Sequence, residues 1–527
     1  MGEIVGKSNS NNSIISVADS MGEQQFRTTS SLKTFSRKSF DSFRIHSFDE
    51  ENPTIIDGIS FSSAAEAAAA VSGKWPGNNN NNKEELNPQD SWLPITESRH
   101  GSIYSSVFHV LTSGIGFQAM LLPLAFASLG WVWGIVCLSL AFVWQLYTIW
   151  VLVNLHESDS GLRYSRFLHL SIAAFGPKAG KIMSIFPVMY LSGGTCAMMI
   201  ITGGGTLKLF FQNICGDGPG LSCKAQSVSG VEWFLVFTCM AILLAQLPNL
   251  NSLTIISFVG AVTAIVYCTI LWALPLGMDR PNEISYDPLP TNSKMDKYGD
   301  VLNGIGIIIL AFRGHNVILE IQATLPSTPK NSSTKTMWKG IKIAYLQIAM
   351  ILFPMAIAGF WAYGDKITFN GGMIKALSQF HGQDLSKFVI GLIYLLIIIN
   401  CLCTFQVYSM IVFDNLEFRY TSIKKQPCTR LLRTVFRLCF GGLVFFISVA
   451  FPFLGSLAPL IGGLTMPLTY SYPCFMWISM KKPLPNRPMW LFNMVLGCLG
   501  LILSVFLVVA AIYNLVDNGL NANFFRP

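Results

Sequence analysis

Residues 311–326 read AFRGHNVILEIQATLP and follow GIGIIIL, a run at residues 304–310 that is apolar apart from its two glycines. Within ten residues the stretch presents five polar or ionisable side chains: Arg313, His315, Asn316, Glu320 and Gln322. Such side chains are expensive at membrane depth and usually serve a function there. The rest of the sequence decides whether this stretch lies in a membrane.

The composition predicts a polytopic membrane protein. Of 527 residues, 51% are hydrophobic and 12% are charged, whereas a soluble domain carries about 25% charged residues. The net charge of +8 does not require a nucleic-acid partner, because basic residues of membrane proteins gather in cytoplasmic loops. We find no metal-ligand spacing and no cofactor motif, so neither a metal nor a cofactor is expected.

Eleven apolar stretches are long enough to cross a bilayer, which takes about 20 residues each. They lie at residues 104–126, 130–153, 182–211, 231–248, 252–275, 301–324, 341–363, 387–414, 432–452, 456–479 and 489–513. With the N-terminus inside, the longer inner loops hold 13 basic residues and the outer segments 7. This bias predicts a cytosolic N-terminus and an extracellular C-terminus.

The predicted domain organisation has three parts. Residues 1–97 are rich in Ser and Asn and are predicted to form a disordered cytosolic tail. Residues 98–515 form the membrane domain with its eleven spans, and residues 516–527 a short extracellular C-terminus. In the outer loop CGDGPGLSC, Cys215 and Cys223 are predicted to form a disulfide; two free thiols are the alternative.

Spans 1 and 6 are interrupted by glycines and polar residues. They are five spans apart, and an odd spacing places a second set of five in the opposite orientation. Corresponding broken helices in inverted halves are typical of the substrate site of a transporter. Half-helix N-termini suit a carboxylate and freed carbonyls suit an ammonium group, so the pair is suited to an amino acid. The alternative is that the glycines only allow close helix packing.

The ionisable residues of span 6 leave several roles open. His315 is a candidate for substrate binding or for proton transfer. Glu320 would carry a coupling proton or pair with a basic residue at the cytosolic edge. Arg313 would meet a substrate carboxylate or neutralise Glu320 or Asp414. Tyr190 and Asn400 are further candidates for the cavity wall.

Several motifs closely resemble the lysine/histidine-type transporters of plants, in the amino acid/auxin permease family. The matching stretches are GHNVILEIQATLPSTP, MWKGIKIAY, LPLAFASLGW, TGGGTLK, QVYSMIVFDNLE, FPFLGSL and PLTYSYPC. The resemblance implies the five-plus-five inverted-repeat fold of the bacterial leucine transporter, all-α with broken helices 1 and 6. It also implies proton-coupled amino acid import across the plasma membrane, with the amino acid, protons and the bilayer as partners.

The candidate site combines the residues that the resemblance implies with those chosen from the spans. The candidate substrate-binding residues are Ser113, Gly114, Ile115, Gly116, Tyr190, Ala311, Phe312, Arg313, Gly314, His315 and Asn400, and His315 and Glu320 are the proton-coupling candidates.

The sequence departs from the family pattern at two places in this site. Relatives carry Gly-x-Gly just before the Leu-Pro of span 1, where this chain reads Gly116, Phe117 and Gln118. The position of Arg313 is usually small or uncharged. We hypothesise that Arg313 favours a substrate with an additional acidic group.

Three alternatives compete with an amino acid carrier. One is a carrier of another small carboxylate, such as an auxin-like aromatic acid. Another is a nutrient receptor that binds without transport. An intramembrane enzyme using His315 and Asn316 is disfavoured, because adjacent helical residues do not face each other.

Overall fold

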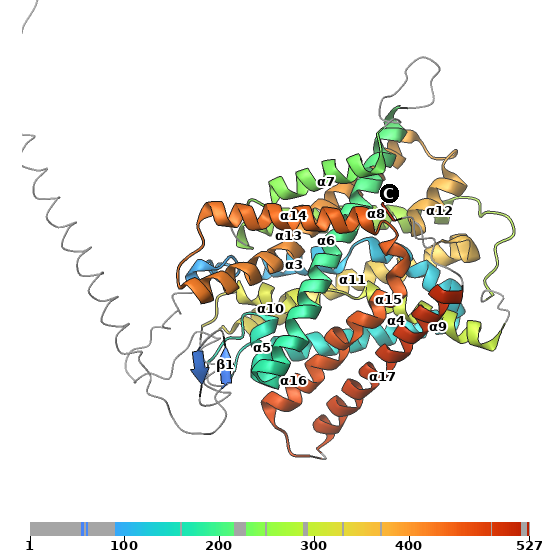
Figure 1. The fold of residues 1–527 in the computed structure, drawn as a ribbon. Helices are drawn as coiled ribbons and strands as arrows, with labels where there is room; N and C mark the ends of the chain where they lie inside the picture. Colours follow the sequence, from blue (N-terminus) through green and yellow to red (C-terminus); the bar gives the residue numbers. More distant parts are fainter. Residues whose placement is uncertain are drawn as a thin grey trace, which may run out of the picture. The chain divides into compact units, whose positions relative to one another are not determined.

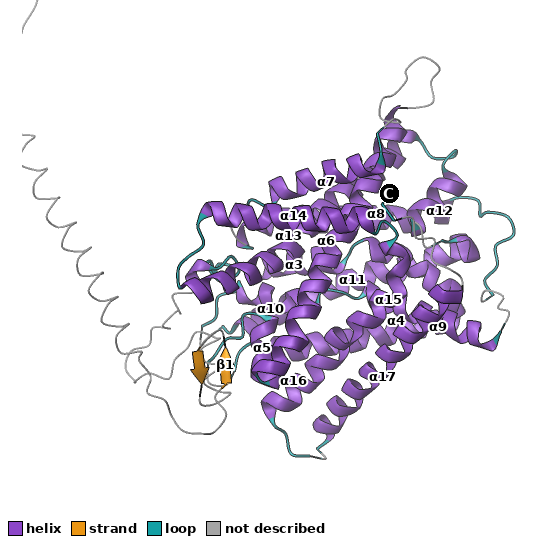
Figure 2. Cartoon of the chain, in the orientation of Figure 1, coloured by secondary structure: helices purple, strands orange, loops and turns teal. Residues whose placement is uncertain are grey.

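A computed structural model describes residues 54–56, 59–61, 90–158, 161–215, 228–247, 250–287, 293–328, 331–368, 371–485, 487–517 and 524–525. The chain divides into two units, Met1–Pro53 and Thr54–Pro527, and the first lies outside the described residues. Within the described part, secondary structure is helical apart from an isolated bridge between Glu157 and Arg163 and a hairpin in which β1 (Thr54–Ile56) pairs antiparallel with β2 (Ile59–Phe61) (Figure 2).

The first predicted span is divided into three helical pieces, and the last of them continues into the second span. Helix α3 (Ile103–Gly114) is followed by the short η2 (Phe117–Leu121) and by α4 (Leu122–Leu155). Within α4, Gly130 has a φ of 70°. This left-handed conformation favours glycine because it has no Cβ, and it separates the outer end of span 1 from span 2.

The remaining elements follow in chain order. Before α3 lies η1 (Asp90–Trp92); after α4 come α5 (Phe167–Phe175), α6 (Pro177–Cys215), α7 (Gly230–Leu244), η4 (Asn251–Leu253), α8 (Thr254–Ala273), η5 (Leu274–Gly277), α9 (Lys294–Ala311), α10 (His315–Ala323), α11 (Ser333–Tyr363), η6 (Gly364–Lys366), α12 (Gly372–His381), α13 (Lys387–Lys424), α14 (Arg430–Ala450), η7 (Leu454–Leu457), α15 (Ala458–Met466), the π-helical η8 (Pro467–Ser471), α16 (Tyr472–Lys481) and α17 (Pro488–Asp517).

Polar residues set where several helices begin. Ser229 and Glu232 cap the start of α7 reciprocally, as do Ser293 and Asp296 at α9. Each side chain accepts a hydrogen bond from a backbone N–H that the first helical turn leaves without an intrahelical partner. The predicted apolar stretches do not include these flanking residues, so the helices begin a little earlier than hydrophobicity alone indicates.

By length and composition, eight helices of the described chain can cross a membrane. One of them, Phe117–Leu155, combines the outer part of span 1 with span 2. The apolar helix α7 is shorter, and the predicted tenth span is divided among α15, η8 and α16. Each predicted span thus coincides with helical structure, while the count of eleven crossings stays a prediction.

The segment that carries the opening sequence is the most enclosed of these helices. In span 6, which comprises α9 and α10, 94% of an apolar 18-residue stretch is buried, whereas the share is 33% in α14 and in α17. In Figure 1, α10 lies among the other helices while α17 lies at the lower margin of the bundle. Close approach needs small residues: a Cβ at Gly462 of α15 would overlap the carbonyl oxygen of Gly306 in α9.

Residues 90–98 pack against the helix ends that loop charge predicts to face the cytosol, which we call the inner ends. The side chains of Leu93, Ile95 and Thr96 are 0%, 1% and 1% exposed. The N–H of Leu250 donates to the carbonyl of Pro94 at 3.2 Å. The domain boundary predicted at residue 97 therefore falls inside a segment that packs with the membrane domain.

Candidate functional site

Both interrupted spans contain a non-helical break. After α3 ends at Gly114, Ile115 and Gly116 are extended. After α9 ends at Ala311, the chain turns through Phe312 and through Gly314, whose φ is 113°. An L-residue with a side chain rarely adopts that angle, which explains the glycine in the motif.

Side chains of neighbouring helices satisfy carbonyl groups that the breaks leave free. The Tyr408 hydroxyl donates to the Ser113 carbonyl at 2.8 Å, and Thr404 donates to the carbonyl before it at 3.2 Å. The Gln145 amide donates to the Arg313 carbonyl at 3.5 Å. Irregular backbone at membrane depth requires such partners. The breaks are therefore supported structural features rather than frayed helix ends.

The two breaks line one cavity of about 900 Å³. Phe117 and Gln118 reach it from the first break, and Phe312 and Arg313 from the second. The opposite walls come mainly from α6, α14 and α15, and Thr469 contributes from the π-helical η8. Pro467 begins η8, and π-turns of this kind are frequent at functional sites. The cavity is mainly apolar, with a few polar groups near the breaks.

Arg313 is the charged residue of this cavity wall. Its side chain is 7% exposed, and its Nε and Nη2 have no hydrogen-bond partner among the described residues. Its guanidinium lies 5.2 Å from the ring centre of Tyr408 and 5.8 Å from that of Phe117. Cation–π contact stabilises the charge but provides no acceptor for its N–H groups. Two buried nitrogens of Arg313 therefore lack an acceptor in the described part of the chain.

The candidate residues from the sequence fall into two groups. Tyr190, Phe312 and Arg313 line the cavity, and Gly116 lies directly against the Arg313 guanidinium. The other candidates support the breaks or tie helices together: Ser113, Gly114, Ile115, Ala311, Gly314, His315 and Asn400.

Two of these supporting residues make specific contacts away from the cavity. His315 Nε2 lies 2.8 Å from the Thr148 hydroxyl of α4. The Asn400 amide donates at 3.0 Å to the carbonyl of Gly260 in α8. The residue after His315, Asn316, donates to Ser192 of α6 at 2.9 Å. The polar residues at the start of α10 therefore fix its position against α4 and α6.

Glu320 lies on the inner half of span 6 and is 1% exposed. One of its oxygens accepts the N–H of Phe167 at 3.1 Å, at the first turn of α5. Its other oxygen has no hydrogen-bond partner in the described residues. A helix N-terminus favours negative charge. Among the described contacts, Arg313 pairs with neither Glu320 nor Asp414. Of the roles predicted for Arg313, binding of a substrate carboxylate in the cavity therefore fits the geometry.

A buried ion pair joins the inner ends of the helices. Arg166 Nε and Nη2 donate to the Asp414 carboxylate at 2.5 and 3.1 Å, and these side chains are 1% and 0% exposed. The Ile95 N–H donates to the same carboxylate at 3.2 Å. Asp414 thus connects α13 both to the loop before α5 and to the segment 90–98.

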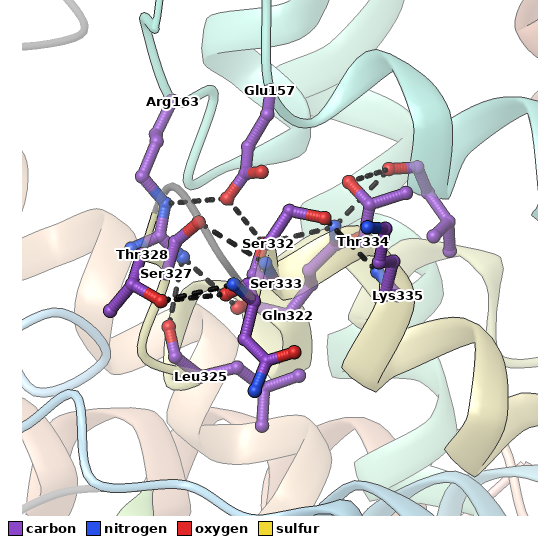
Figure 3. A network of polar contacts seen from close by, with 12 residues as sticks. Glu157, Arg163, Gln322, Leu325, Ser327, Thr328, Ser332, Ser333, Thr334 and Lys335 are labelled. Carbon is purple, nitrogen blue, oxygen red and sulfur yellow. Dashed lines mark hydrogen bonds and ion pairs between the residues drawn. The ribbon is translucent and has the colours of Figure 1, made fainter.

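A second inner network fastens the loop after span 2 to the end of span 6 (Figure 3). Arg163 lies 3.4 Å from Glu157 and donates to the carbonyl of Leu325 at 2.9 Å. Ser333, at the start of α11, donates to Glu157 at 2.6 Å. These contacts and the Asp414 ion pair together tie the inner helix ends to one another, and we call this group of contacts the inner closure.

Several residues of the site were not candidates for the cavity wall. Phe117 and Gln118 had been noted as departures from the family pattern, and their place beside a break was the signal that could have identified them. Thr469 had a weaker signal, the proline two residues before it. Cys215 is disulfide-bonded, while Cys223 lies outside the described residues, so the pairing of the two stays a prediction.

Comparison with known proteins identifies a family and relatives of this chain. Residues 99–516 match the family model described as transmembrane amino acid transporter protein. The chain is 50% identical over 443 residues to lysine histidine transporter-like 8 of Arabidopsis thaliana, which covers 84% of each chain. It is 47% identical to lysine histidine transporter-like 7 of the same plant, over 84% of this chain and 90% of the relative.

Solved structures show a likeness of fold. The crystal structure of MhsT in complex with L-phenylalanine aligns with a TM-score of 0.50 at 11% identity, over 77% of this chain and 98% of that one. A manganese transporter from Eremococcus coleocola aligns with a TM-score of 0.51 at 10% identity, over 80% and 88%. The predicted fold class, all-α with a leucine-transporter-like arrangement, is confirmed.

The relatives named above are transporters, a class of proteins without enzymatic activity. The match covers the membrane helices, both helix breaks and the cavity between them. The chain therefore belongs to the transmembrane amino acid transporter family and resembles its lysine histidine transporter-like members.

Proposed function

We propose that this protein is a proton-coupled amino acid importer that works by alternating access. The observation that carries the proposal is the convergence of both helix breaks on one cavity. Transporters with inverted repeats bind substrate at such breaks, and one bundle then rocks against the other. The family resemblance is our basis for placing the protein in the plasma membrane. Loop charge is our basis for a cytosolic N-terminus and an extracellular C-terminus.

The polar groups around the cavity support binding of a small carboxylate-bearing molecule. The first turn of α10 begins at the second break and presents backbone N–H groups with partial positive charge. The Gln118 side-chain oxygen is buried and has no partner among the described residues, so it is available to accept from an ammonium group. Thr469 adds a hydroxyl on the facing wall.

Glu320 is our main candidate for the coupling proton. It is buried, one oxygen is free of partners, and the other holds the first turn of α5. Protonation would remove the negative charge that this helix end favours and would weaken the bond to Phe167. Because α5 follows Arg166 directly, the change would reach the inner closure. His315 is the second candidate, and its contact with Thr148 supports a role in positioning α10.

The inner closure supports the alternating-access part of the proposal. The cavity lies between the breaks, and the contacts of Arg166 with Asp414 and of Arg163 with Glu157 lie on the cytosolic side of it. Release of substrate to the cytosol requires these contacts to break. The segment 90–98, which Asp414 holds through Ile95, would then move away from the helix ends.

The test is uptake of radiolabelled amino acids into proteoliposomes in sodium-free medium, with and without an imposed pH gradient. We expect the wild type to accumulate substrate when the outside is acidic. Glu320→Gln keeps an oxygen acceptor for the Phe167 N–H but cannot release a proton. We expect the gradient-driven uptake of this variant to fall at least tenfold, while exchange of labelled for unlabelled substrate is retained.

His315→Gln is the matched control, because it keeps a hydrogen-bonding side chain beside Thr148 and should retain the response to the gradient. Gradient dependence that is lost in His315→Gln and kept in Glu320→Gln would transfer the coupling role to His315. Absence of uptake of every common amino acid by the wild type would refute the proposal and favour a receptor that does not transport.

A further inference from the structure

We infer that the cavity selects substrates of net negative charge, and that Arg313 is the residue that determines this selectivity. The inference rests on the proposed transport function and specifies its substrate class. The ligand is a carboxylate whose total charge is −1 at neutral pH, and cationic amino acids such as lysine are excluded. This differs from what the names of the lysine histidine transporter-like relatives indicate.

The first support is the state of the Arg313 charge. Its side chain is 93% buried, and two of its nitrogens have no hydrogen-bond partner in the described part of the chain. The two acids that the sequence offered as partners for Arg313 are committed elsewhere: Asp414 pairs with Arg166, and Glu320 accepts the Phe167 N–H. A buried charge is costly unless it is paired. We therefore infer that a bound ligand supplies the negative charge that pairs with Arg313.

The second support is the charge balance of the cavity. Among its described lining residues, Arg313 is charged and none is acidic. A zwitterionic neutral amino acid satisfies its own two charges at the helix ends and leaves the guanidinium uncompensated. A ligand with one further carboxylate, or a carboxylate without an amine, neutralises the site. A cationic amino acid would add a second positive charge to it.

The third support is a separate cavity of about 600 Å³ that adjoins the first one. Both cavities share Phe117, Met198 and Gly455 in their walls. The charged lining residues described in this second cavity are Lys208 and Lys375, and again none is acidic. Basic groups along an approach raise the local concentration of anions and lower that of cations. The route and the site thus carry the same sign of charge.

The fourth support joins the two departures from the family pattern. A Cβ at Gly116 would overlap Nη2 of Arg313 and would lie 3.0 Å from the side-chain oxygen of Gln118. Glycine at 116 therefore makes room for the long side chain at 313. Gln118 lies beside it, so the three residues form one unit. The two departures are therefore explained together: they place the Arg313 guanidinium beside the side-chain amide of Gln118.

Two kinds of ligand share this chemistry, an acidic amino acid and an amine-free apolar acid. The apolar cavity wall suits the second, and the free oxygen of Gln118 suits the ammonium of the first. The experiment includes both, with L-glutamate and indole-3-acetate as probes. L-leucine and L-lysine represent the neutral and cationic classes.

Uptake of the four probes is measured in proteoliposomes with wild type, Arg313→Gln and Arg437→Gln. Arg437 is the matched control: it is 3% exposed, lies 5.5 Å from the Phe413 ring and does not line the cavity. We expect at least one anionic probe to exceed leucine and lysine at least tenfold in the wild type and in Arg437→Gln. In Arg313→Gln that preference should fall at least tenfold.

Thermal stabilisation of the purified wild type by each probe gives a readout that needs no variant, and it should follow the same order. The inference is refuted if the wild type takes up leucine or lysine at the same rate as the anionic probes and Arg313→Gln leaves the order of the four uptake rates unchanged. The proposed transport function would still stand. If no probe and no other common amino acid is taken up, the proposed function itself fails. Preference for glutamate over indole-3-acetate, or the reverse, identifies the ligand type.

Discussion

Asp414→Asn tests the inner closure through the ion pair that joins three segments. The substitution removes the charge that faces Arg166 and keeps an oxygen for the Ile95 N–H. Both side chains of the pair are buried, so the substitution takes the Asp414 charge away from a buried arginine. Breaking a buried pair in this way costs about 3–5 kcal/mol. If the cost falls on the closed state, the open fraction rises roughly a hundredfold or more, since about 1.4 kcal/mol is tenfold.

The assay is the rate of alkylation of a cysteine placed at residue 95 by a water-soluble maleimide from the cytosolic side. Ile95 is 1% exposed in the closed arrangement, so Ile95→Cys should react slowly until the segment leaves the helix ends. The control is Asp365→Asn at the partly exposed pair with Lys366, where 24% of the Asp365 side chain and 35% of the Lys366 side chain are exposed. Such a pair contributes about 0–1 kcal/mol. A labelling rate that rises less than threefold in Asp414→Asn, or equally in both variants, would refute the role of the pair.

Two further predictions concern stability and pH. Gly462→Ala should destabilise the protein by about 1–3 kcal/mol in thermal unfolding, because the new methyl group overlaps the Gly306 carbonyl, whereas Gly205→Ala meets no atom within 4 Å and should match the wild type. Burial, with the charges of two neighbouring arginines, holds the pKa of His156 well below its usual value near 6.5. The unfolded chain therefore takes up a proton below about pH 6.5 that the folded chain excludes, and the free energy of unfolding should fall by up to about 1.4 kcal/mol per pH unit below that value. In His156→Phe the free energy of unfolding should depend less on pH in this range. An unchanged pH dependence would contradict the role given to His156.

Much of the fold follows from hydrophobic length alone. Each predicted span coincides with helical structure because some 20 apolar residues must hydrogen-bond internally in a bilayer. The helix ends were less predictable, since polar residues continue helices into water: α13 extends to Lys424, ten residues beyond the predicted end of span 8. The helices α5 and α12 lie between the predicted spans, and helices of nine or ten residues give little periodic signal in the sequence.

The site shows a similar division. The glycines and charges of the opening stretch indicated the breaks, because irregular backbone in a membrane needs a reason. Sequence could not show which side chains enter the cavity, since that depends on rotation about each helix axis. His315 and Arg313 are two residues apart, yet His315 contacts Thr148 and Arg313 faces the cavity. The packing of residues 90–98 was likewise missed, because its contacts with Asp414 are distant in sequence.

We propose that the two helix breaks and Arg313 form the substrate site. Electron cryomicroscopy of the full-length protein in lipid nanodiscs, with its most strongly transported substrate bound, tests it most directly. We expect ligand density between Phe117 and Phe312, with a carboxylate within hydrogen-bond distance of the Arg313 guanidinium. Density at another place in the bundle, or a ligand that leaves Arg313 without a contact, would contradict it.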